Sequence, residues 1–310
     1  MSDLAPIILF VYNRPQHTMR MLESLHRNNL ADRSELYIYA DGPNSDASKD
    51  NLVSINRVRE VIRGKKWCHT VHIIENTENR GLAASIIEGT NQIVNRYGKA
   101  IILEDDLITS PFFLKYMNQA LTIYAKNENV MQICGYMLPI QHKGLRETLF
   151  LRLTSSWGWA TWARAWKYFE SDAGILEKSF SEQDKQTFNL DGAYDYYSFF
   201  KLHRENKINS WAIRWYASVF LRNGLCLHPS RSLVYNCGHD DSGIHSKKTD
   251  IFETQLMMHE ITDFNDHIQE DREALGRIQK YYLDSNKGKS GHGNIVRRIF
   301  QGLDKLKRLS

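Results

Sequence analysis

The stretch KAIILEDDLITSP, residues 99–111, decides the fold of this chain. Its apolar part, residues 100–103, has the unbroken run of apolar side chains that is typical of a strand buried on both faces. Three consecutive acids follow this run: Glu104, Asp105 and Asp106. Ser110-Pro111 then predicts the start of a helix, with serine as the N-cap and proline at the first helical position. We therefore expect the acids at the carboxyl end of a buried strand, where open α/β sheets bind ligands.

Three adjacent carboxylates repel one another, and a divalent cation would relieve that repulsion. A solvated acidic turn between a strand and a helix is the simpler interpretation of these residues. The apolar strand before the acids and the cap after them favour a site for a metal ion and a diphosphate.

The composition limits the class of protein. The chain has 310 residues, 42% hydrophobic and 25% charged, which suits one large globular domain or two small ones. No apolar run approaches the ~20 residues that span a bilayer, and the first residues are not expected to act as a signal segment. Four widely spaced cysteines without a CxxC pair fit reduced thiols in the cytoplasm. The net charge of +4 does not by itself imply a nucleic-acid partner, and none is expected.

Strands and helices alternate before the acids. They are expected at residues 6–12, 16–27, 35–40, 51–63, 70–75 and 82–97. This alternation predicts a mostly parallel sheet covered by helices, which would form a Rossmann-like half of the fold. No GxGxxG or P-loop motif is present. Each strand ends in polar sequence, so Arg14, Asp41, Arg80 and the acids should meet at one edge. A plain turn is the simpler account of Asp41-Gly42 taken alone.

The second half is rich in tryptophan. The helical spacing of Trp159, Trp162 and Trp166 predicts a helix, with the last two in the core. Trp157, Gly158 and Trp159 are expected to bind sugar at the entrance of this helix, because aromatic faces stack on sugars and glycine permits close approach.

Further along, residues 171–189 are polar and are expected to form a surface excursion. Residues 191–204, 210–223 and 254–282 are expected to be helical. Arg214, in the second of these helices, could hold an acceptor phosphate or carboxylate, or simply extend from a packed helix to solvent.

The C-terminal segment begins with a Gly/Ser/Lys linker at residues 285–293. Residues 294–310 then place apolar side chains on one helical face and basic ones on the rest. This pattern fits a helix lying on an anionic membrane surface. A helix docked on the domain or on a second subunit fits as well.

Five segments together resemble glycosyltransferases of the GT-A fold, and most of all the N-acetylglucosaminyltransferase I group and bacterial family-2-like sugar transferases. They are PIILFVYNRP (6–15), YADGPN (39–44), ENRGLAAS (78–85), AIILEDDLITSPFF (100–113) and SSWGWATWARAWKYF (155–169). The resemblance covers roughly residues 6–245. It implies an α/β fold with a nucleotide-sugar-binding half (1–108) fused to a mixed α/β acceptor-binding half (109–284), followed by the tail (285–310).

The resemblance also implies roles for individual residues. Asp106 would coordinate Mn²⁺ or Mg²⁺ bridging the diphosphate of the donor. Glu104 and Asp105 would contact sugar and ribose, Asp41 the uracil, and Arg14 would line the same pocket.

The ten residues 236–245, NCGHDDSGIH, are expected to form a loop that closes over the donor. In some relatives a histidine toward the C-terminal end also coordinates the metal. We expect His245 to make this contact, and His239 is the second candidate. A surface loop with incidental histidines is an equal alternative.

The chain departs from eukaryotic relatives at the catalytic base. Their base is an aspartate on a helix after the tryptophan segment, whereas residues 211–222 contain no carboxylate. Asp195 and Asp240 are the candidates that remain.

Taken together, the sequence predicts a metal-dependent, inverting hexosyl- or N-acetylhexosaminyltransferase. Its donor would be a nucleotide diphosphate sugar, expected to be a UDP-sugar. Its acceptor would be a hydroxyl of a glycan or a lipid-linked oligosaccharide in bacterial surface polysaccharide or lipopolysaccharide synthesis. The protein is expected in the cytoplasm, either free or at the inner face of the cytoplasmic membrane. The alternatives are a nucleotidyltransferase that makes sugar nucleotides and a non-catalytic carbohydrate-binding protein on the same fold.

Overall fold

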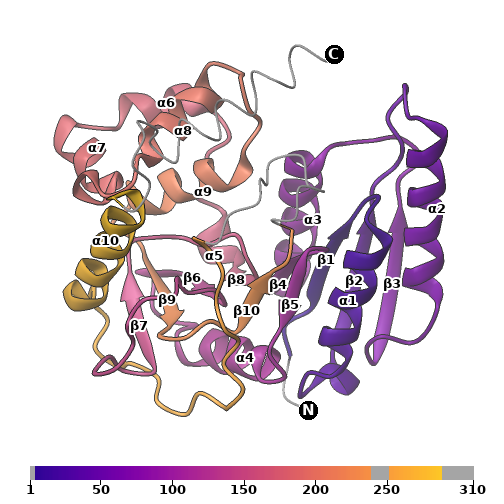
Figure 1. Ribbon diagram of the computed structural model, residues 1–310, viewed down its shortest axis with the longest axis horizontal. Helices are drawn as coiled ribbons and strands as arrows, with labels where there is room; N and C mark the ends of the chain where they lie inside the picture. The colour runs from indigo at the N-terminus through magenta and orange to yellow at the C-terminus, as the bar shows by residue number, and fades with distance from the viewer. Residues whose placement is uncertain (1–3, 239–250, 288–310) are drawn as a thin grey trace.

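The computed structural model describes residues 4–238 and 251–287, and the structural statements below concern that part of the chain. Its centre is a sheet of eight strands in the order β3-β2-β1-β4-β8-β6-β9-β7, which runs across the whole molecule (Figure 1). The sheet is continuous through both predicted halves. The predicted boundary at residue 108 therefore falls within a shared sheet and stays a prediction.

The N-terminal half alternates strands and helices as the sequence predicts. Its elements are β1 (Ile7–Val11), α1 (Pro15–His26), β2 (Glu35–Ala40), α2 (Lys49–Arg63), β3 (Thr70–Glu75), α3 (Leu82–Tyr97) and β4 (Lys99–Glu104). β1 pairs in parallel with β2 on one side and β4 on the other, and β2 pairs in parallel with β3. The predicted α/β class with a Rossmann-like half is confirmed.

The second half completes the sheet with antiparallel as well as parallel pairs. Its strands are β6 (Val130–Cys134), β7 (Thr148–Leu151), β8 (Trp159–Trp162) and β9 (Leu225–Pro229). Its helices are α4 (Phe113–Ile123), α5 (Ala163–Trp166), α6 (Ala173–Lys178), α7 (Glu182–Phe188), α8 (Tyr196–Arg204), α9 (Trp211–Phe220) and α10 (Arg272–Lys287). A separate antiparallel pair is formed by β5 (Leu107–Thr109) and β10 (Val234–Asn236).

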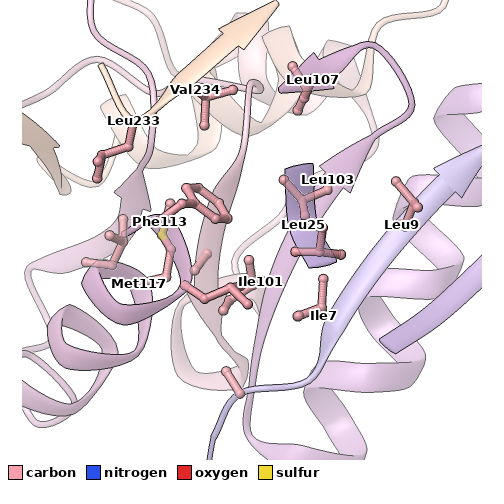
Figure 2. Packing of buried hydrophobic residues seen from close by; sticks show 14 of the residues in the cluster. Ile7, Leu9, Leu25, Ile101, Leu103, Leu107, Phe113, Met117, Leu233 and Val234 are labelled. Carbon is pink, nitrogen blue, oxygen red and sulfur yellow. The ribbon is translucent and has the colours of Figure 1, made fainter. Parts of the chain in front are cut away.

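Side chains of β1 and β4 are buried on both faces of the sheet, which explains their unbroken apolar runs. On one face they pack with α1 and α4, as Figure 2 shows for Ile7, Leu9, Ile101, Leu103 and Phe113. Their alternate residues pack on the other face, against α3. Each such side chain contributes roughly 1.5–3 kcal/mol by leaving water, so these central strands are firmly fixed. β1 and β4 therefore give rigid support to the loops at their carboxyl ends.

The predicted helix start at Ser110-Pro111 is wrong. The chain after the acids first forms β5, because residues 107–109 pair with β10. α4 begins only at Phe113, with Phe112 as its N-cap residue. The Ser110 hydroxyl donates to the main-chain oxygen of Met257 at 2.6 Å and accepts from the N–H of Phe112 at 3.3 Å.

The helix predicted from the spacing of the tryptophans is also wrong in its first part. Residues 159–162 form β8, which lies between β4 and β6 in the sheet. Only the next four residues are helical, as α5. Because β8 is buried on both faces, its tryptophans do not alternate with polar residues, and their spacing of three residues imitates that of a helix.

Two expectations for the rest of the chain need correction. The polar stretch 171–189 is not a mere surface excursion, because it forms α6 and α7 and buries Leu176, Phe180 and Phe188 against α8 and α9. Within 254–282, helix is confined to α10, which begins at Arg272 and extends through the first residues of the predicted linker.

His239, Asp240, His245 and the predicted C-terminal helix lie outside the described residues. Among the helices of residues 4–238 and 251–287, none combines the length and the apolar character that crossing a membrane needs.

Candidate functional site

The acids and Arg14 lie at the point where the order of the strands reverses. From β1 the chain proceeds outward through β2 and β3, and then returns to place β4 on the other side of β1. β1 and β4 run in the same direction with Phe10 opposite Glu104, so their carboxyl ends lie side by side. The loops that leave this point bind ligands in open α/β sheets. The expected meeting of Arg14 with the acids is thus found in the structure.

A single nitrogen of Arg14 bridges two of the acids. Nη2 donates to Oδ1 of Asp105 and, at 3.0 Å, to Oδ2 of Asp106. The side chains of Arg14, Asp105 and Asp106 are 19%, 8% and 17% exposed, so the bridge is largely shielded from water. Burial alone would lower the pKa of Arg14, but the two carboxylates outweigh burial and raise it. The guanidinium is therefore held firmly in its charged form.

The acid cluster carries more negative charge than Arg14 can balance. Burial raises the pKa of Glu104 well above its usual range, and the charges of Asp106 and Asp105 add to this effect. Burial also raises the pKa of Asp105, to about 6, against the opposing influence of Arg14. Within the part of the chain that is described, no side chain donates a hydrogen bond to the Glu104 carboxylate. A further positive charge at this edge would stabilise the ionised carboxylates.

The pair of strands β5 and β10 fixes the position of Asp106. The main-chain oxygen of Asp106 accepts hydrogen bonds from Cys237, at 2.8 Å from its N–H and 3.2 Å from its Sγ. Gly238 passes so close that a Cβ there would lie 2.4 Å from Asp106 Oδ2. The segment that begins the predicted loop 236–245 therefore reaches the acids.

His17 is a neighbour of the acids that the sequence analysis did not identify. It lies on α1 one turn after Arg14 and is 8% exposed. A positive charge on His17 would lower the pKa of Asp105. The spacing of three residues from Arg14 on the helix after β1 is the signal that could have indicated it.

Asp41 is placed at the same edge but is bound to the main chain. Oδ1 accepts hydrogen bonds from the N–H groups of Arg80, at 2.9 Å, and of Gly42, at 3.0 Å. Oδ2 accepts one from the N–H of Gly81, also at 3.0 Å. Asp41 thus anchors the loop that leads into α3. Its contact with a uracil stays a prediction.

The Arg80 side chain does not join the acids in this structure. Its Nη1 donates to Glu88 of α3 at 2.6 Å, and the side chain is 52% exposed. What Arg80 contributes to the edge of the sheet is its main-chain N–H, bound to Asp41.

Trp157 and Gly158 lie at the edge that carries the acids, because β8 runs antiparallel to β4 with Trp159 opposite Ile102. The ring of Trp157 packs edge-on against Tyr136, at 4.5 Å between centroids, and against Phe252, at 5.5 Å. Gly158 has φ +60°, and a Cβ there would lie 2.8 Å from Val234. The structure therefore requires glycine at this position for its conformation and its packing.

Trp159 is a core residue, which corrects the expectation that it stacks on a sugar. Its side chain is 0% exposed, and its ring stacks on Trp211 at 5.2 Å between centroids. A side chain without exposed surface cannot contact a substrate in this conformation.

Asp195 and Arg214 are not joined to the acids either. Asp195 is the N-cap of α8, and its carboxylate accepts hydrogen bonds from the N–H and hydroxyl of Ser198, at 3.1 and 2.6 Å. In Figure 1, α8 lies with α6 and α7 at the upper left, away from β4. Arg214 is 8% exposed and donates to the main-chain oxygen of Ser210 at 3.2 Å. Both side chains have structural partners.

The donor set fits a hard divalent cation that arrives with a phosphate ligand. Among the described residues, no three side chains of His, Cys, Asp or Glu form a cluster that could hold a metal by themselves. Mg²⁺ and similar cations are, however, commonly held by one or two carboxylates together with substrate phosphates and water. Asp106 and its neighbours supply such carboxylates.

A cavity of about 660 Å³ lies elsewhere, beside Arg146, His267 and Arg272, and its lining contains no predicted site residue.

Comparisons with known proteins give only distant likenesses. No family model and no curated protein matches the chain. A crystal structure of S. aureus TarS 1-349 is similar with a TM-score of 0.41 and 13% identity, over 75% of this chain and 60% of that one. This chain therefore spans less than two thirds of the TarS structure. UDP-glucose pyrophosphorylase complexed with UDP-glucose is similar with a TM-score of 0.38 and 10% identity, over 76% of this chain and 94% of that one.

Proposed function

We propose that this chain is a metal-dependent glycosyltransferase that moves a sugar from a nucleotide diphosphate sugar to an acceptor hydroxyl. The observation that carries the proposal is the position of Arg14 and the three acids at the reversal point of the strand order. That place binds nucleotides in open α/β sheets, and carboxylates beside a guanidinium suit a cation and a diphosphate. The resemblance of the five sequence segments supports uridine as the base.

Each residue of the edge has a task in this proposal. Asp106 would hold the cation, while Asp105 and Glu104 would accept hydrogen bonds from hydroxyl groups of the ribose and the sugar. When bound, Mn²⁺ or Mg²⁺ supplies positive charge that offsets the charge developing on the leaving diphosphate. Asp41 positions the loop before α3, through three main-chain N–H groups.

Trp157 would form the wall next to the transferred sugar. It lies at the same edge of the sheet as Glu104, and its ring is supported by Tyr136 and Phe252. An aromatic wall binds the apolar face of a sugar and keeps water from the anomeric carbon. The acceptor oxygen would attack that carbon from the side opposite the diphosphate, which inverts its configuration.

Two aspartates, Asp195 and Asp240, are the candidates for the base that removes the acceptor proton. Asp195 caps α8, and Asp240 lies outside the described residues. Asp240 follows Gly238 by two residues, and Gly238 touches Asp106. We therefore propose Asp240 before Asp195. The acceptor class, the surface-polysaccharide pathway and contact of the C-terminal helix with a membrane are proposed on the sequence alone.

Release of UDP from UDP-sugars tests the proposal. With Mn²⁺ present and no acceptor, we expect slow UDP release from one donor among UDP-hexoses and UDP-N-acetylhexosamines. Adding EDTA should stop the release, because the diphosphate then loses its counter-charge. Release of pyrophosphate from UTP and a sugar 1-phosphate would instead indicate a nucleotidyltransferase. Turnover of none of these compounds, without any thermal stabilisation by them, would contradict the proposal.

A further inference from the structure

The bridge between Arg14 and the acids has an unusual geometry. A guanidinium often pairs with one carboxylate through two parallel hydrogen bonds. Here a single nitrogen, Nη2, lies between two carboxylates and bonds Asp105 and Asp106. One positive centre between two carboxylates is also how a metal ion is held. Arg14 therefore occupies the place at Asp106 where the proposed function needs a cation.

Arg14 and a divalent cation cannot both hold this place. The Oδ2 atom of Asp106 already accepts the Arg14 hydrogen bond at 3.0 Å, and Gly238 packs against the same oxygen. With the carboxylates only 8–17% exposed, water does little to screen two positive charges at such a distance. A cation can bind Oδ2 of Asp106 only if the guanidinium moves away from that oxygen.

We infer that Arg14 is an exchangeable counter-ion of the acid cluster. It neutralises Asp105 and Asp106 when no nucleotide is bound, and it yields Asp106 to a divalent cation when a diphosphate enters. The freed guanidinium then binds the diphosphate, whose negative charge draws it off the acids. This inference rests on the proposed function for its second half, the transfer to the diphosphate.

The exchange makes the binding of the divalent cation and the binding of the diphosphate cooperative. Without a diphosphate, a cation must displace Arg14 and gains no phosphate ligand, so it binds weakly. With a diphosphate, Arg14 has a new partner and the cation has a second anionic ligand. Each ligand must then raise the affinity for the other by the same factor.

Binding of Mn²⁺ to the nucleotide-free chain tests the inference directly. We expect Arg14→Gln to bind Mn²⁺ at least about tenfold more tightly than the unchanged chain, because the competing charge is gone. The same variant should bind UDP, measured calorimetrically with Mn²⁺ present, at least about tenfold more weakly. The bound fraction of Mn²⁺ can be measured by electron paramagnetic resonance at low ionic strength.

Two further variants control for charge and shape. Arg14→Lys keeps a positive charge at the acids and should bind Mn²⁺ as weakly as the unchanged chain. Arg20→Gln removes a charge from the exposed side of the same helix, near enough to act on Cys237 but without a bond to the acids. It should alter the Mn²⁺ affinity by less than about threefold, since exposed charges are screened.

The possible results distinguish a failure of the Arg14 exchange from a failure of the proposed function. Unchanged or weaker Mn²⁺ binding by Arg14→Gln, or equal gains in Arg14→Gln and Arg20→Gln, would overturn the exchange even if the chain binds UDP. A gain confined to Arg14→Gln, with no binding of UDP by any variant, would support competition for the acids and refute the nucleotide-sugar function. If Arg14→Gln is unfolded in EDTA, folding on addition of Mn²⁺ supports the exchange, and failure to fold with Mn²⁺ contradicts it.

Discussion

Replacing Asp106 by asparagine is expected to lower metal-dependent UDP release by at least about a hundredfold, which corresponds to about 2.7 kcal/mol of transition-state stabilisation. The amide that replaces the carboxylate is neutral and binds a hard dication poorly. Without the cation, the leaving diphosphate loses its main counter-charge. The rate of UDP release and the Mn²⁺ dissociation constant with UDP present are the quantities to compare.

The same substitution should cost little stability, about 1 kcal/mol or less, because it removes one of three neighbouring negative charges. Asparagine has nearly the same shape, and the hydrogen bonds of Cys237 go to the main chain of Asp106 and not to its side chain. Thermal unfolding followed by circular dichroism checks this. Asp46→Asn, at an exposed acid between β2 and α2, is the matched control and should leave both activity and stability unchanged. An Asp106→Asn chain with more than half of the original activity would refute the role of Asp106.

Replacing Asp41 by alanine is expected to lower the free energy of unfolding by about 3 kcal/mol, the largest stability effect that we predict at the site. Asp41 is 8% exposed and accepts hydrogen bonds from the N–H groups of Gly42, Arg80 and Gly81. Alanine leaves these donors without their acceptor, and a buried donor without a partner, such as the N–H of Gly42, costs about 1–3 kcal/mol, whereas the part-buried N–H groups of Arg80 and Gly81 cost less. Water entering the space left by the carboxylate would recover part of the loss, so the total stays below the sum of the individual costs.

Urea unfolding followed by tryptophan fluorescence measures this effect. Asp41→Asn keeps one acceptor oxygen and should fall between the alanine variant and the unchanged chain. Asp46→Ala, which removes an exposed acid from the same loop region, should change the stability by less than about 0.5 kcal/mol. If Asp41 serves only to contact a base, Asp41→Ala will weaken UDP binding and leave the unfolding free energy unchanged, and the anchoring role is then wrong.

The alternating half of the fold could be predicted because its signals are local. The apolar runs of β1 and β4 and the apolar stripes of α1 to α3 lie within single elements, and their alternation predicts a mostly parallel sheet but not the order of its strands. The prediction that Arg14 meets the acids needed only the rule that parallel strands end at one edge.

The failures arise where contacts between distant segments decide the local structure. The sequence predicts Ser110 as an N-cap, but its N–H donates to the main-chain oxygen of Leu233, more than a hundred residues later, and α4 begins only at Phe113. The sequence predicts Trp159 as a helical residue that stacks on a sugar, but it lies in β8 between β4 and β6 in the sheet. The anchoring role of Asp41 could not be predicted either, because nothing near it in sequence shows that the N–H groups of Arg80 and Gly81 will face it. Sequence patterns thus predicted that Arg14 and the acids meet at one edge of the sheet, but they could not show which side chains there already have partners.

Anomalous diffraction at the manganese edge, from crystals grown with UDP and Mn²⁺, tests the central claim most directly. The account predicts a peak about 2.0–2.6 Å from a carboxylate oxygen of Asp106, with the diphosphate on its other side and the Arg14 guanidinium moved away from that oxygen. Bound UDP at another place, or no peak at the acids while Arg14 still bridges Asp105 and Asp106, would contradict it.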